Sequence, residues 1–144
     1  MLLAMTRAER EAYLADLHVG VISIERSGCA PLAVPIWYDY DPEVGVWLLT
    51  GGDSEKGRAL ALAGRFALCA QSEAPPNYKY VSVEGPIRSV RPARREEDTR
   101  PMARRYLGRE LGDRYVESLD NAGNVYTMQP ERWRTVDYSK TGRS

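Results

Sequence analysis

Residues 50–58 (TGGDSEKGR) form the stretch whose composition most clearly suggests binding chemistry. The stretch combines two hydroxyl side chains, Thr50 and Ser54, with two cations, Lys56 and Arg58, around a flexible polar turn. Backbone N–H groups at a helix start, together with such side chains, can bind a phosphate monoester. The spacing GxxxxGK[ST] of a Walker loop is absent. An ordinary capped helix with solvated Lys and Arg side chains is the alternative interpretation.

Few other side chains suggest catalysis. The chain has one histidine, His18, and its two cysteines, Cys29 and Cys69, occur in no CxxC or Cys/His spacing. We therefore expect no metal site and no disulfide, and the sequence identifies no catalytic residue. His18 is most simply a structural residue, and an axial haem ligand is the alternative.

The composition predicts one globular domain that spans residues 1–144. Hydrophobic residues make up 43% of the 144, and 20 basic side chains balance 20 acidic ones, for a formal net charge of +0. Such a balance argues against nucleic acid or an anionic membrane as a partner, and any bound anion should be small. The apolar start at residues 1–5 is too short for a signal peptide, and no run has the ~20 apolar residues of a membrane span. A cytoplasmic location is expected.

The first half of the chain predicts a helix followed by three strands. Thr6 and Glu9 form a capping-box pattern, and β-rich residues then begin at His18. Residues 32–40 alternate between two faces, and Pro35 within them predicts an edge, a bulge or backbone left free for a ligand. The turn at residues 41–45 leads into a strand at 46–50, so these two strands should be adjacent and antiparallel.

The second half predicts a helix at residues 55–63, capped by Ser54 or Asp53, and strands at 66–71 and 78–90. Two or three short helices should follow within residues 93–119 and cover one side of the barrel. Residues 124–128 and 132–138 predict a final strand or a bent strand pair interrupted at Pro130. Hairpin-linked strands without repeated βαβ units favour a closed antiparallel barrel with appended helices.

Several short stretches, taken in order, resemble the pyridoxamine 5′-phosphate oxidase-like family, particularly its actinobacterial branch that uses FMN or the deazaflavin coenzyme F420. These stretches are residues 37–41 (WYDYD), 45–50 (GVWLLT), 54–56 (SEK), 80–85 (YVSVEG), 105–108 (RYLG) and 130–133 (PERW). Each stretch is short, but their joint order runs through nearly the whole chain.

The resemblance implies an α+β fold that is mainly β: a six-stranded antiparallel split β-barrel with short flanking helices. It also implies a homodimer with FMN or F420 at the subunit interface. By position, backbone of the second strand would face the isoalloxazine ring, Lys56 would bind the phosphate, and Trp133 would reach the cofactor from the other subunit. The full set of implied cofactor-binding residues is Val34, Pro35, Ile36, Trp37, Leu49, Thr50, Ser54, Lys56, Gly57, Arg58, Tyr80 and Trp133.

Departures from the family pattern narrow the expected activity. True pyridoxamine-phosphate oxidases carry basic residues at the positions of Val34 and Glu55 and a C-terminal Arg-x-His-x-Arg segment, which residues 133–138 lack. We therefore expect an FMN- or F420-dependent oxidoreductase that transfers hydride between the cofactor and a small conjugated organic substrate. A non-catalytic carrier or sensor of flavin, F420 or haem is one alternative, and a barrel that serves only as a dimeric interaction module is another.

Overall fold

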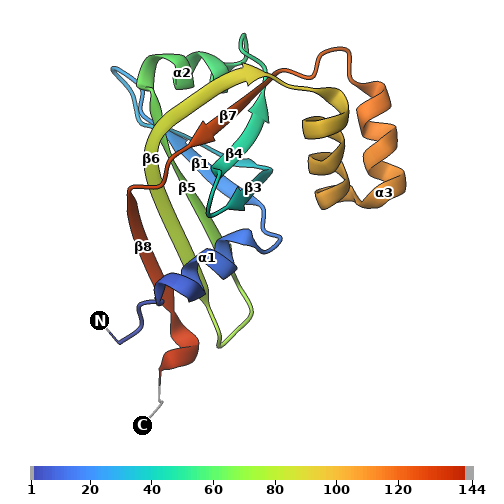
Figure 1. Ribbon diagram of the computed structural model, residues 1–144. Coiled ribbons are helices and arrows are strands. Elements are labelled where there is room, and N and C mark those ends of the chain that lie inside the picture. Colours follow the sequence, from blue (N-terminus) through green and yellow to red (C-terminus); the bar gives the residue numbers. More distant parts are fainter. Residues whose placement is uncertain (1, 142–144) are drawn as a thin grey trace.

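The computed structural model describes residues 2–141 as a curled antiparallel sheet with helices at its ends and one side (Figure 1). The helices are α1 (Arg7–Ala15), α2 (Glu55–Ala63) and α3 (Arg100–Ser118), with a π-helical turn η1 (Arg95–Thr99) before α3 and a 3₁₀ turn η2 (Tyr138–Lys140) near the C-terminus. The strands are β1 (Gly20–Ile24), β2 (Leu32–Ile36), β3 (Tyr38–Asp41), β4 (Gly45–Thr50), β5 (Arg65–Ser72), β6 (Lys79–Pro92), β7 (Asn124–Met128) and β8 (Arg132–Asp137).

The strands pair in the order β2-β1-β5-β6-β7-β4-β3, and β8 pairs with β6 beside this path. Every pairing is antiparallel. The two ends of the path, β2 and β3, are consecutive in the chain and only Trp37 separates them, so the sheet curls round on itself. The predicted α+β split barrel is confirmed.

The expected strand number of six is wrong, because the sheet has eight strands within residues 2–141. Two of the expected strands are each divided by a bend. The run at residues 32–40 breaks at Trp37, where its first part pairs with β1 and its second part with β4. The C-terminal run breaks between β7 and β8, and both halves pair with the long strand β6.

Gly85 on β6 permits the second bend. A Cβ atom at Gly85 would lie 1.8 Å from the carbonyl oxygen of Gln129, so only glycine lets the connecting backbone pass this closely. The N–H of Gln129 donates to the Pro86 carbonyl at 2.9 Å, and the N–H of Glu131 donates to the Glu84 carbonyl at 2.8 Å. The bend is therefore hydrogen-bonded to β6 on both sides of Pro130.

The core fills the inside of the curled sheet. The predicted alternation at residues 32–40 is confirmed, because Leu32, Ile36, Tyr38 and Tyr40 are buried. Burial raises the pKa of Tyr38, whose hydroxyl donates to the Leu14 carbonyl at 2.6 Å. This bond joins the core to α1, which packs against β3 and β6.

Both predicted helix caps, Thr6 for α1 and Ser54 for α2, are confirmed. The Thr6 side chain accepts from the Glu9 N–H, and the Glu9 carboxylate accepts from the Thr6 N–H, which completes the capping box of α1. Ser54 caps α2, and its Oγ accepts from the Gly57 N–H at 3.0 Å. No helix within residues 2–141 has the length and apolar character needed to cross a lipid bilayer.

Helices η1 and α3, with the C-cap residue Leu119, form a hairpin, here called the helical arm (residues 95–119), that stands beside the barrel (Figure 1). The predicted set of short helices is confirmed, since α3 is interrupted at Gly108, where φ is +80°. Gly112 lets the two segments of α3, before and after Gly108, approach each other closely, because a Cβ at Gly112 would lie 2.8 Å from the backbone nitrogen of Arg104. Arg95 donates to the carbonyls of Val116 and Leu119 and joins the start of the arm to its end.

Candidate binding cleft between the barrel and the helical arm

A cleft of about 570 Å³ lies between the barrel and the helical arm. Its walls come from β2, from the end of β4, from the start of α2, from the arm and from the segment that precedes β7. The lining residues are Val19, Pro35, Ile36, Trp37, Leu49, Thr50, Gly51, Lys56, Thr99, Met102, Ala103, Tyr115, Leu119, Asn121, Ala122 and Gly123.

The barrel side of the cleft is built on the bend after β2. Strand β2 lies at one end of the sheet path and pairs only with β1, where Pro35 is opposite Val21. The prediction that Pro35 marks an edge strand is therefore confirmed, because proline cannot donate to a second neighbour. Backbone at residues 35–37 borders the cleft and is not covered by another strand along this edge.

The other end of the barrel wall is the turn between β4 and α2. The Ser54 hydroxyl donates to the Gly51 carbonyl at 2.6 Å and lies 3.1 Å from the Thr50 hydroxyl oxygen. These bonds hold the turn in shape and place Thr50, Gly51 and Lys56 on the cleft. Lys56 is the one charged side chain among the lining residues, and it lies in the first turn of α2, where N–H groups lack helical partners.

Gly57 allows the turn to lie against the helix. A Cβ at Gly57 would lie 2.1 Å from the Gly51 carbonyl oxygen and 2.9 Å from that of Gly52. Any side chain at this buried position would push the turn away from α2. The shape of the turn between β4 and α2, which is the candidate phosphate-binding site, thus depends on Gly57, a residue that does not itself line the cleft.

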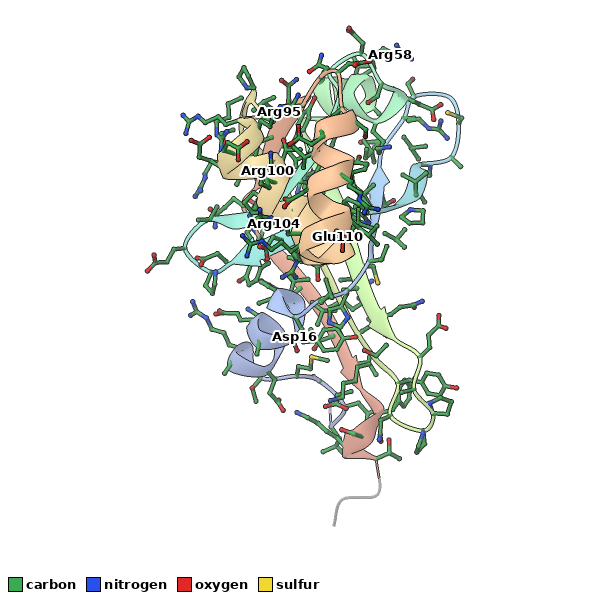
Figure 2. The ribbon with its side chains drawn as sticks, turned by 90° about the vertical axis from the view of Figure 1, so that its right-hand side faces the viewer. Asp16, Arg58, Arg95, Arg100, Arg104 and Glu110 are labelled. Carbon is green, nitrogen blue, oxygen red and sulfur yellow. The ribbon has the colours of Figure 1, made fainter. Side chains whose placement is uncertain are left out.

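The arm side of the cleft is mostly apolar. Met102, Ala103 and Leu119 contribute aliphatic surface, and Tyr115 lies tilted against Trp37 with ring centroids 5.5 Å apart and planes at 58°. Figure 2 shows the two segments of the arm side by side in front of the barrel, with Arg95, Arg100 and Arg104 along the first segment. The cleft therefore has aromatic surface from Trp37 and Tyr115 and one end that carries the cation Lys56.

Half of the residues predicted to bind the cofactor line this cleft. They are Pro35, Ile36, Trp37, Leu49, Thr50 and Lys56. Two more, Ser54 and Gly57, shape the turn but do not line the cleft. The tertiary structure thus brings together two distant parts of the sequence, residues 35–37 and 49–56, as the resemblance implies.

Four of the residues predicted to bind the cofactor neither line the cleft nor shape its turn. Val34 is half-buried against the core, and Arg58 donates to the Asp53 carbonyl and points outward from α2 at the top of Figure 2. Tyr80 lies on β6 between Gln71 and Val136. Trp133 on β8 meets Tyr40 edge-on and carries the Arg10 guanidinium 4.5 Å above its ring. A role for any of them at the cofactor stays a prediction.

The arm residues of the cleft do not appear among the predicted site residues. The sequence feature that could have indicated them is helical spacing, which places the residues of each segment on one helix face. These residues are Thr99, Met102 and Ala103 on the first segment and Tyr115 and Leu119 on the second. The sequence predicts that these helices cover the barrel, but helical spacing alone does not say which opening they cover.

His18 does not line the cleft. Its Nε2 donates to the Tyr13 carbonyl at 2.9 Å, and its ring stacks on the Tyr13 ring with centroids 4.4 Å apart. Burial lowers the pKa of His18. Both cysteines are free thiols, and within residues 2–141 no group of three His, Cys, Asp or Glu side chains is arranged to hold a metal ion.

No family model matches the sequence, and no curated protein matches it. Several solved structures, however, are similar to this chain. The conserved hypothetical protein Rv2991 from Mycobacterium tuberculosis is similar with a TM-score of 0.79 and 20% identity, over 99% of this chain and 91% of that protein. A protein named F420 reductase is similar with a TM-score of 0.59 and 19% identity, over 86% of this chain and 94% of that one.

Two further structures show how widely the fold is used. A putative pyridoxamine 5′-phosphate oxidase from Listeria innocua has a TM-score of 0.61 and 14% identity over 86% of this chain and 92% of that one. HutZ, the haem storage protein from Vibrio cholerae, has a TM-score of 0.63 and 12% identity over 91% of this chain and 94% of that one. The chain therefore has the split-barrel fold of the pyridoxamine 5′-phosphate oxidase-like proteins.

Proposed function

We propose that the protein binds FMN or F420 in the cleft and acts as an oxidoreductase on a small, conjugated organic substrate. One observation carries the proposal: the free edge of β2 and the cation Lys56 border the same cleft. A flat ring would lie along residues 35–37, and the cofactor phosphate would lie at the start of α2, beside Lys56.

The lining residues fit such a cofactor. A flavin or deazaflavin is a planar aromatic ring system with polar groups on one edge, joined to an anionic tail, and the cleft has a largely apolar, aromatic wall with one cation at its end. Ligand pockets of this kind are usually apolar with a few placed polar groups, and their volumes are roughly 300–1,000 Å³. The close approach of Gly57 to the turn keeps Lys56 and the Gly51 backbone together at that end.

The bound cofactor would supply hydride transfer, and the protein would bind it, orient it and exclude water. The described lining residues contain no His, Cys, Asp or Glu that could exchange a proton near neutral pH. Among the lining residues, the phenol of Tyr115 and the hydroxyl of Thr50 are hydrogen-bonding groups that can orient a substrate. A reaction that depends on the cofactor rather than on a catalytic side chain is consistent with this set.

We further propose that two chains associate beside the cleft, as the resemblance implies. Pro35, Val21 and Cys69 are opposite one another on β2, β1 and β5 and form an apolar row on the outer face of the sheet. Pro35 and Val21 are exposed, and Pro35 also lines the cleft. A second copy seated on this row would cover exposed apolar surface next to the proposed cofactor.

The deciding experiment is titration of cofactor-free protein with FMN, with F420 and with hemin, followed by absorbance and fluorescence. Micromolar or tighter binding of FMN or F420 is expected, and turnover is then tested by mixing the reduced holoprotein with quinones and enones. Reduction without turnover would favour the carrier alternative. Binding of hemin alone, or of none of the three, would contradict the proposed function.

A further inference from the structure

The helical arm is rich in charge, yet the face that borders the cleft carries none. Residues 95–119 include six arginines and six acidic residues. None of these described side chains lines the cleft. Five of the arginines donate instead to acidic side chains of the arm or to backbone carbonyls of the arm and of the end of α1, and these are Arg95, Arg100, Arg104, Arg105 and Arg114.

Only part of the arm surface on the cleft is accessible to a ligand. The arm wall, defined here as the arm residues that line the cleft, consists of Thr99, Met102, Ala103, Tyr115 and Leu119. The first three are 4%, 3% and 1% exposed. Tyr115 is 41% exposed, and Leu119 is half-buried. A molecule in the cleft therefore meets the arm chiefly at Tyr115 and Leu119.

Tyr115 gives the arm wall an aromatic surface. Its ring is tilted by 58° against the ring of Trp37, with centroids 5.5 Å apart. One face of the Trp37 indole is already covered, because Tyr106 stacks on it at an interplanar angle of 4°. Flat aromatic molecules are stabilised by offset-stacked or edge-on contact with such rings. The accessible arm wall therefore favours a flat ring system.

An anion on the arm wall would lose hydration without gaining a partner. Moving an ionised carboxylate into apolar surroundings is costly unless a cation or several donors pair with it. Lys56, the one cation among the lining residues, belongs to the other side of the cleft, in the first turn of α2. The cleft thus has a barrel side that can pair with an anionic tail and an arm side that suits an uncharged molecule.

We propose that the arm wall, chiefly through Tyr115 and Leu119, selects an uncharged, flat aromatic substrate and excludes anions of the same shape. This inference rests on the proposed function, in which the cofactor ring lies along residues 35–37 of the barrel. Because the cleft separates that strand edge from the arm, the substrate lies between the cofactor ring and the arm wall. Tyr115 and Leu119 determine specificity, and hydride transfer belongs to the cofactor.

The test uses two probes of nearly the same shape. One is the uncharged ketone 2-acetylnaphthalene, and the other is 2-naphthoate, which has a carboxylate in place of the acetyl group. Each is titrated by calorimetry into protein loaded with FMN or F420 and into cofactor-free protein. Loaded wild type should bind the ketone about tenfold more tightly than the carboxylate. In cofactor-free protein Lys56 is free to pair with 2-naphthoate, so only differences between variants are compared there.

A cation on the arm wall should reverse the exclusion of anions. Leu119→Lys should bind 2-naphthoate about tenfold more tightly than wild type does, a gain that partial unfolding cannot produce. Leu111→Lys is the matched control, because Leu111 is on the same arm and 56% exposed but does not line the cleft. Its affinities for both probes should stay within about twofold of wild type.

The aromatic ring at position 115 should matter more than its hydroxyl. Tyr115→Ala should bind 2-acetylnaphthalene about tenfold more weakly than wild type, because the ring surface is lost. Tyr115→Phe keeps the ring and should lose about twofold at most. Equal losses in the two variants would reject the Tyr115 ring as the selecting group.

Three further results would overturn the inference. They are equal binding of the two probes by loaded wild type, no gain for 2-naphthoate in Leu119→Lys beyond that in Leu111→Lys, and ketone binding that is absent or disappears once the cofactor is bound. Failure of wild type to bind FMN and F420 would reject the proposed function instead. The cofactor-free titrations of the Leu119→Lys, Leu111→Lys and Tyr115 variants would then still decide whether the arm wall selects uncharged molecules.

Discussion

The indole ring of Trp37 lies parallel to the ring of Tyr106, with centroids 5.1 Å apart and an interplanar angle of 4°. Trp37 is the single residue between β2 and β3, and Tyr106 lies on the helical arm. The Tyr106 hydroxyl lies 2.6 Å from the His18 carbonyl oxygen and 2.9 Å from that of Tyr38, and the Tyr38 N–H donates to it at 3.1 Å. The arm therefore docks on the same bend that borders the cleft.

Removing the Tyr106 hydroxyl should loosen this docking. Tyr106→Phe keeps the stacked ring but leaves the Tyr38 N–H and the His18 carbonyl without their partner. We expect a loss of about 1–3 kcal/mol in the free energy of unfolding, measured by urea denaturation. Tyr115→Phe, on the half-exposed aromatic ring across Trp37, should change the free energy of unfolding much less. Equal effects of the two substitutions would contradict this role of Tyr106.

Removing the Lys56 ammonium should weaken cofactor binding. Loss of a charge-assisted hydrogen bond to phosphate is worth about 1.5–3 kcal/mol, so Lys56→Ala should raise the dissociation constant of FMN or F420 correspondingly. Arg58→Ala is the matched control, because Arg58 is two residues away on the same helix but donates to the Asp53 carbonyl outside the cleft. Affinity of Lys56→Ala equal to that of wild type would show that the phosphate site is misplaced.

A side chain at Gly57 should distort the turn between β4 and α2. Gly57→Ala would place its Cβ 2.1 Å from the Gly51 carbonyl oxygen, and relieving this clash should cost about 3 kcal/mol of stability. Gly51→Ala serves as the control, since a Cβ at Gly51 meets nothing within 4 Å. Thermal unfolding of both variants measures the effect. Similar melting temperatures would argue against the close packing of the turn on α2.

The helical arm should lose stability in acid through Asp113. Its carboxylate accepts from Arg104 at 2.8 Å and from Arg100 at 2.9 Å, and these bonds lower the pKa of Asp113 from 3.8 to about 2. The folded protein thus holds this proton less tightly than the unfolded chain. The stabilisation is complete above about pH 4 and disappears as the pH falls through the folded-state pKa.

Melting temperatures of wild type and Asp113→Asn across this pH range test that linkage. The difference between the two proteins should be constant near neutral pH and should shrink as the pH falls from about 4 toward 2. Using the difference removes the contribution of Glu9, whose pKa is also lowered to about 2, chiefly by its hydrogen bond to Lys140. A difference that does not vary with pH would be evidence against the linkage.

A charge in the apolar row on the outer sheet face should prevent association of two chains. Val21, which is 39% exposed, is opposite Pro35 and Cys69, so Val21→Glu would place a carboxylate at the centre of the proposed contact. Sedimentation equilibrium should show a dimer for wild type and a monomer for Val21→Glu. Val44→Glu, at a position 43% exposed in the turn before β4, should remain dimeric. A wild-type monomer would contradict the proposed homodimer.

Much of the local structure could be predicted from the sequence because its causes are local. The capping box of Thr6 and Glu9, the Ser54 cap and the alternation through residues 32–40 each depend on residues a few positions apart. The ordered stretches that resemble the family also predicted that residues 35–37 and residues 50–56 bind one cofactor; Pro35, Ile36, Trp37, Thr50 and Lys56 border one cleft, and their role at a cofactor stays a prediction.

The tertiary structure alone decided the rest, because the causes lie far apart in the chain. The extended run breaks at Trp37 because β2 before it pairs with β1 and β3 after it pairs with β4, and no neighbouring residue in the sequence indicates this change of pairing. The arm covers the cleft because Tyr106 reaches backbone 68 residues away at Tyr38. Thr99 looks like any helical threonine in the sequence, and only the packing around it shows that its hydroxyl is buried without a partner among residues 2–141. Short-range patterns specify helices and strands, whereas long-range packing determines which surfaces meet and hence where a ligand can bind.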